Sequence, residues 1–117
     1  MIIGVGVDLC SVERLRESLQ RTPNLGPRLF TPKEIELKAE SLAGRFAAKE
    51  ALAKALGDPR LLSWQEVEVV SDSLQKPHLT ITGSSAQALK ARGVISSHLS
   101  ISHDGGFAVA MVVLEGI

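Results

Sequence analysis

Apolar residues alternate with glycines at the start of the chain. The segment Ile3–Asp8 places branched apolar residues at every second position and glycines between them, which is the period-two pattern of a β-strand with one apolar and one nearly bare face. We expect Asp8 to end this strand beside open space. Ser11 then predicts the N-cap of a helix that ends near Arg21, before a loop over Pro23–Pro27.

The middle of the chain carries two helix signals. Thr31–Glu34 has the residues of a capping box, with a proline at the first helical position, and predicts that a helix begins there. Leu42–Leu56 is rich in Ala, Leu, Lys and Glu, which favour helices. Gly57 and Pro59 provide the stop signal. We therefore expect the longest helix of the fold over residues 42–56.

The second half alternates strands with one short helix. Period-two patterns predict strands over 66–69 and 78–82, and a helix follows over 84–92. Two more strands, over 99–102 and 107–114, flank Asp104–Gly106, which predicts a tight hairpin turn. This order of elements indicates an α+β fold with a small, largely antiparallel sheet packed with helices. A chain of 117 residues suits one domain, over residues 1–117.

The composition argues against several classes of protein. Thirteen Lys and Arg residues balance thirteen Asp and Glu residues, so no net charge attracts the chain to a polyanion. Aromatic residues make up 3% of the chain, with no tyrosine, which leaves few surfaces on which bases can stack. We expect no nucleic-acid partner.

The single cysteine and the hydropathy pattern bear on the compartment. Cys10 has no intrachain partner, so it is expected to behave as a small buried apolar residue. The first residues lack the basic region of a signal peptide. No segment approaches the roughly 18 to 20 apolar residues that a membrane span requires. The sequence predicts a cytoplasmic protein that does not enter the membrane.

The long helix carries the residues with most chemical potential. Because residues four apart share a face, Phe46, Glu50 and Lys54 form one row, with Arg45 and Lys49 in the adjacent row. The simplest interpretation is a solvated face with a weak Glu–Lys pair. Five alanines between positions 47 and 55 favour a second interpretation, since small side chains allow another backbone or a ligand to approach.

Two carboxylates suggest a site for Mg²⁺. Asp8 and Glu50 would supply two oxygen ligands, and Mg²⁺ typically fills its other positions with water and substrate phosphates. Lys54 would then contact one phosphate as a point charge, and Arg45 another through its planar guanidinium. The spacing in the sequence does not establish that Asp8 and Glu50 meet, and a lone aspartate here also fits a turn or a helix start.

Ser102, His103 and Asp104 do not form a hydrolase triad. Neighbours on a strand point to opposite faces, so these three side chains cannot relay a proton as a triad does. His103 remains a single polar residue near a strand end, a position that also suits a structural histidine.

Four blocks of residues follow one another along the chain: Gly4–Leu9 with Arg14, Phe30–Glu34, Gly44–Ala51 with Lys54, and Ser100–Asp104. In this order they resemble the holo-acyl-carrier-protein synthases, the short single-domain members of the 4′-phosphopantetheinyl transferase superfamily. The specificity of the match lies in the order and spacing of the blocks, which cover nearly the whole chain.

The resemblance implies an activity and an assembly. It implies transfer of 4′-phosphopantetheine from coenzyme A to a serine of apo-acyl-carrier protein in fatty acid biosynthesis. Adenosine 3′,5′-bisphosphate would be released, and Mg²⁺ would be required. It also implies a homotrimer whose active sites lie at the subunit interfaces.

The resemblance also assigns roles to the metal and carrier-protein residues. Asp8 and Glu50 match the family's metal-binding acids, and Lys54 matches a catalytic lysine on the same helix face. Glu50, directly or through a metal-bound water, is the candidate acceptor of the serine proton. Arg14 matches an arginine that engages the carrier protein, and Arg21 lies two helical turns further along the same stripe.

The remaining assignments concern coenzyme A. Arg45 and His103 match residues that contact its nucleotide end, together with Lys54, and Gly57 and Pro77 match positions that line the cleft. Many relatives carry a glycine before the Lys-Pro pair, where this chain has Gln75.

Two alternative functions stay open from the residues alone. One is a non-catalytic module that binds a phosphorylated ligand or an acidic helix through Arg14, Arg21 and Arg45. The other is a different metal-dependent phosphate-transfer enzyme, such as a nucleotide pyrophosphatase without a protein acceptor.

Overall fold

The computed structural model describes all 117 residues. The helices and strands, in chain order, are β1 (Ile2–Ser11), α1 (Val12–Arg21), α2 (Leu25–Leu29), α3 (Ala39–Leu56), β2 (Val67–Ser71), β3 (Pro77–Ile81), α4 (Gly83–Ala91), β4 (Val94–Asp104) and β5 (Phe107–Gly116). The strands form an antiparallel sheet of order β1-β5-β4 and a separate antiparallel pair, β2-β3. The predicted α+β fold class is confirmed. No helix is long and apolar enough to cross a membrane.

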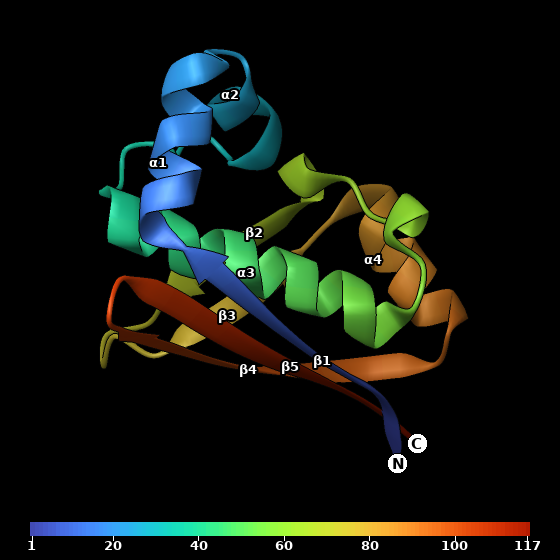
Figure 1. Cartoon of the computed structure of the whole chain (residues 1–117). Helices are drawn as coiled ribbons and strands as arrows, with labels where there is room; N and C mark the ends of the chain where they lie inside the picture. Colours follow the sequence, from blue (N-terminus) through green and yellow to red (C-terminus); the bar gives the residue numbers. More distant parts are fainter.

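Helix α3 lies directly on one face of the three-stranded sheet (Figure 1). Small residues allow this close packing. A Cβ atom added at Gly6 would lie 1.9 Å from the carbonyl oxygen of Ala51, and one added at Gly4 would lie 1.9 Å from that of Ala55. The bare face of β1 therefore contacts the helix backbone itself, which fixes how α3 and β1 are aligned.

The opposite face of the sheet is apolar and exposed. Val5, Val7 and Leu9 on β1 are 58%, 54% and 63% exposed. Val7 and Leu9 pair with Met111 and Val109 of β5, which are also exposed on this face. No helix covers this face in Figure 1. We call these five residues, together with Phe107, the outer sheet face.

The hydrophobic core forms a single cluster of 18 buried residues centred on α3. Several predicted features around it are confirmed. Gly57 ends α3 in the left-handed conformation, with φ of 94°. Gly105 and Gly106 form the hairpin turn between β4 and β5 and have φ of 58° and 83°, values that glycine adopts without steric cost.

The helix predicted to begin at Thr31 does not form. The capping contact exists, because Glu34 Oε1 accepts a hydrogen bond from the backbone N–H of Thr31 at 3.0 Å, but only turns follow and α3 begins at Ala39. The same carboxylate also accepts bonds from Lys49 Nζ at 2.6 Å and from the backbone N–H of Val69 at 2.9 Å. Tertiary contacts of Glu34 thus replace the continuation of the helix.

Three other predictions need correction. Asp8 lies inside β1 and not at its end, because pairing with β5 extends the strand to Ser11. The loop predicted over Pro23–Pro27 overlaps helix α2. Lys49 does not lie on a solvated face: its side chain is fully buried and pairs with Glu34.

Candidate active site

Asp8, Glu50 and Lys54 come together where β1 crosses α3. Asp8 lies on the face of β1 that carries Gly4 and Gly6, so its side chain is directed toward the helix. Lys54, one turn from Glu50 on α3, donates hydrogen bonds to Asp8 Oδ1 at 3.1 Å and to the carbonyl oxygen of Val7 at 3.0 Å. The meeting that the sequence spacing left open is therefore present in the fold.

The electrostatics of this cluster favour a cation. Burial raises the pKa of Glu50, the Asp8 carboxylate raises it further, and Lys54 opposes both effects. Two carboxylates face one ammonium, so the cluster keeps an excess negative charge. No group of three or more His, Cys, Asp or Glu side chains is arranged to hold a metal ion. A site with two carboxylates suits Mg²⁺, which takes one or two carboxylates together with water and phosphate oxygens.

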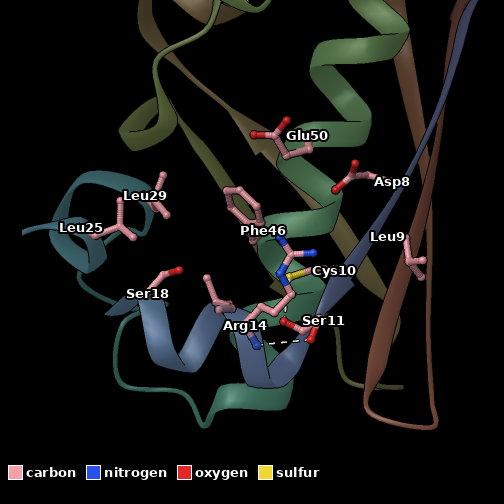
Figure 2. A pocket seen from close by; sticks show the side chains of 11 residues that line it. Asp8, Leu9, Cys10, Ser11, Arg14, Ser18, Leu25, Leu29, Phe46 and Glu50 are labelled. Carbon is pink, nitrogen blue, oxygen red and sulfur yellow. Dashed lines mark hydrogen bonds between the residues drawn. The ribbon is translucent and has the colours of Figure 1, made fainter. Parts of the chain in front are cut away.

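A cavity of about 530 Å³ opens beside the two carboxylates, between α1, α2 and α3 (Figure 2). Arg14 extends from α1 into this space, and the backbone N–H of the same residue donates a hydrogen bond to the cap Ser11. Leu25 and Leu29 of α2 form the wall opposite Phe46. The cavity thus combines an apolar wall with charged groups at one end.

Sequence reasoning missed the α2 wall because the prolines and Gly26 indicated a loop. The four-residue spacing of Leu25 and Leu29 could have indicated this short helix, because it places both side chains on one side of a helical turn. Gly26 is buried, and an added Cβ would meet Ile35 at 2.7 Å, so this glycine serves packing and not a flexible turn.

Gly57 lies close to the same cluster. It lines a smaller hollow of about 270 Å³ together with Glu50 and Lys54. An added Cβ on Gly57 would meet nothing within 4 Å, so the backbone is open to a ligand at this point.

Arg45, Pro77 and His103 are the remaining candidate residues for coenzyme A, and we call them the second group. Arg45 donates a weak hydrogen bond of 3.4 Å to Ser71, which pairs with Pro77 across the β2-β3 ladder. The buried Nε of Arg45 has no hydrogen-bond partner. His103 Nε2 lies 3.0 Å from the carbonyl oxygen of Glu40. None of the three lines the cavity beside Asp8.

Arg21 does not join either group. It lies exposed in the last turn of α1, outside the cavity that contains Arg14. The predicted stripe of Arg14 and Arg21 is therefore a feature of the α1 surface, and only Arg14 reaches the candidate site.

Comparison with known proteins identifies the family. A sequence model of the 4′-phosphopantetheinyl transferase superfamily matches residues 4–112, a stretch that includes both groups of candidate residues. The chain belongs to this superfamily. A holo-[acyl-carrier-protein] synthase of Clavibacter michiganensis subsp. michiganensis is 56% identical over 116 residues, which cover 99% of this chain and 98% of the relative.

Solved structures of the superfamily agree with this assignment. The holo-[acyl-carrier-protein] synthase of Neisseria meningitidis superposes with a TM-score of 0.91 and 31% identity, covering 98% of this chain and 99% of that one. The Helicobacter pylori synthase in complex with coenzyme A superposes with a TM-score of 0.84 and 32% identity, covering 95% and 99%. The enzyme class predicted from the sequence, holo-acyl-carrier-protein synthase, is confirmed.

Proposed function

We propose that this enzyme transfers the 4′-phosphopantetheine group of coenzyme A to a serine of apo-acyl-carrier protein and releases adenosine 3′,5′-bisphosphate, as a step of fatty acid biosynthesis. The observation that carries the proposal is the convergence of Asp8 with Glu50 and Lys54, with Lys54 Nζ 3.1 Å from Asp8 Oδ1. Superfamily membership and the coenzyme A complex of the Helicobacter pylori relative support it.

In the proposed reaction, the serine hydroxyl attacks the β-phosphorus of the pyrophosphate of coenzyme A, and the bond to the leaving phosphate breaks. Asp8 and Glu50 would hold Mg²⁺, which when bound neutralises charge on the pyrophosphate. Lys54 stabilises the leaving phosphate by its charge. Glu50, directly or through water, accepts the serine proton, a role that suits a carboxylate whose pKa is raised by burial.

The acceptor side of the site is proposed to be the cavity between α1, α2 and α3. An acidic carrier protein would meet Arg14 at its mouth, while Leu25, Leu29 and Phe46 offer an apolar surface. Arg21 lies outside the cavity and would contribute only through long-range attraction. This arrangement brings the acceptor hydroxyl to the side of the cluster from which Arg14 extends.

The nucleotide end of coenzyme A is assigned to Arg45, His103 and Pro77, with Gly57 beside the pyrophosphate. The unpartnered Nε of Arg45 supports a role in anion binding. Because these residues lie apart from Asp8 within one chain, we propose that a complete site forms between neighbouring copies in a homotrimer. The exposed outer sheet face supports this assembly, since monomers rarely leave a continuous apolar patch uncovered.

Mass spectrometry of an apo-carrier protein incubated with the enzyme, coenzyme A and Mg²⁺ tests the reaction. We expect the carrier to gain the mass of one phosphopantetheine group, and Asp8→Ala and Glu50→Ala to abolish this gain while the fold survives. Glu36→Ala, which removes an exposed carboxylate that forms no hydrogen bond or salt bridge, is the matched control. Full turnover in excess EDTA, or release of adenosine bisphosphate without a carrier protein, would overturn the proposal.

Complementation tests the composite site. Asp8→Ala and His103→Ala each impair one of the two residue groups, so mixed assemblies of these two inactive variants would contain some sites with both groups intact. We expect activity to return when the variants are unfolded, mixed and refolded together, and light scattering to give the mass of a trimer. A monomeric enzyme that is fully active, or mixtures with no recovered activity, would contradict the assembly.

A further inference from the structure

Lys54 binds a carboxylate oxygen of Asp8, one of the two proposed ligands of the divalent cation. Its ammonium lies 3.1 Å from Asp8 Oδ1 and 3.0 Å from the carbonyl oxygen of Val7. It forms no ion pair with Glu50, although the two residues are one helical turn apart on α3. The lysine is thus directed across to β1, where it neutralises Asp8.

The Lys54 contact is accessible to water. The Lys54 side chain is 56% exposed, whereas that of Asp8 is 17% exposed. Ion pairs of this kind exchange readily, because solvent screens the attraction and the long side chain retains freedom. Asp8 is therefore the more buried member of the pair, and Lys54 is the member that solvent or a ligand can reach.

We propose that Lys54 competes with the divalent cation for Asp8, so that the enzyme binds metal weakly until a phosphate-bearing donor draws the lysine away. The proposal rests on the proposed function, because it takes Asp8 and Glu50 as the metal ligands. Lys54 thereby has an additional role: it limits metal affinity before the donor binds and contacts the donor afterwards.

The competition has two physical sources. A cation that takes Asp8 Oδ1 must displace the ammonium from that oxygen, and it also meets the positive charge of Lys54 nearby. For a divalent ion about 5 Å from an ammonium in a water-like dielectric, the repulsion alone corresponds to roughly a tenfold loss of affinity. A bound phosphate gives Lys54 an alternative anionic partner, which removes both penalties and couples donor binding to metal binding.

Direct metal titration tests the proposal without turnover. Mn²⁺, which prefers the same oxygen ligands as Mg²⁺, is titrated into the protein alone, and free Mn²⁺ is followed by electron paramagnetic resonance. We expect Lys54→Met to bind Mn²⁺ about tenfold more tightly than the wild type. Lys54→Arg keeps the charge and should change the affinity by less than about threefold. Lys90→Met makes the same charge change on the exposed surface of α4 and should leave the affinity unchanged.

The possible outcomes separate this inference from the proposed function. If Asp8→Ala abolishes Mn²⁺ binding while Lys54→Met binds no more tightly than the wild type, the competition is refuted and the metal site stands. If neither the wild type nor Lys54→Met binds Mn²⁺ at millimolar concentration, both the metal site and the competition are wrong. Equal tightening by Lys54→Met and Lys90→Met would show a general charge effect and would also refute the proposal.

Discussion

Replacing Gly6 with alanine tests how the contact between β1 and α3 controls the site. An added Cβ would lie 1.9 Å from the carbonyl oxygen of Ala51 and 2.7 Å from the backbone nitrogen of Ala55. Both neighbours are backbone atoms of a buried helix, so they cannot rotate away. An ordinary contact requires β1 to move outward by roughly 1.5 Å.

Gly6→Ala is expected to lower the unfolding free energy by about 3 kcal/mol, which is the upper end of the usual range for overpacked cores. Asp8 is two residues away on the same strand, so its position relative to Lys54 should change as well. A misplacement of about 1 Å in a catalytic group can lower the rate ~100-fold. We therefore expect kcat to fall at least tenfold in protein that circular dichroism shows to be folded.

Urea unfolding at one fixed protein concentration measures the stability change, because the stability of the proposed trimer would depend on concentration. Gly57→Ala is the control, since its added Cβ meets nothing within 4 Å and only the φ of 94° is unfavourable, for a cost of about 1 kcal/mol. A loss below ~1 kcal/mol for Gly6→Ala, with unchanged kcat, would refute the reasoning about this contact.

Three further predictions concern other parts of the chain. Arg14→Glu should raise the KM for carrier protein and make it depend less on salt, while the affinity for coenzyme A is kept. Arg21→Glu should have a smaller effect on the same KM. A loss of coenzyme A affinity in Arg14→Glu would show that the carrier protein binds elsewhere. Hydrogen bonds from Ser85 and Ser84 lower the pKa of Glu66 to about 2, so its stabilisation is complete above about pH 4.5 and is lost as the pH falls toward 2. In Glu66→Gln the melting temperature should therefore depend less on pH between about 4.5 and 2 than in the wild type. An equally steep dependence on pH would contradict this. Gln75 has φ of 63°, so Gln75→Gly should raise the unfolding free energy by about 1 kcal/mol in urea titrations, and a loss would contradict the strain.

The sequence predicted well those elements whose local pattern agrees with their tertiary environment. The end of α3 at Gly57 and the hairpin at Gly105 and Gly106 depend on backbone conformations that glycine adopts easily, so short-range signals were sufficient. The capping residues at Thr31 carried an equally strong local signal, yet the helix is absent. There the carboxylate of Glu34 binds Lys49 and β2, which no local pattern indicates.

Residue type and family resemblance proposed Asp8, Glu50 and Lys54 as candidates, but they did not indicate how these residues are arranged. The fold brings the three together. The separation of Arg45 and His103 from this cluster depends on which sides of α3 the strands occupy. That is a property of packing between distant segments, so the spacing along the chain did not reveal it.

The buried pair of Glu34 and Lys49 has a consequence for the cooperativity of folding. Its carboxylate binds Lys49 and the amide of Val69, which are 15 and 35 positions away in the chain. The desolvation penalty of each buried charge is offset only when all its hydrogen-bonding partners are in place. Partly folded forms that bury α3 without β2 would leave this carboxylate short of partners, and they are disfavoured for that reason. The pair thus links the assembly of α3, the preceding turn and β2 into one event.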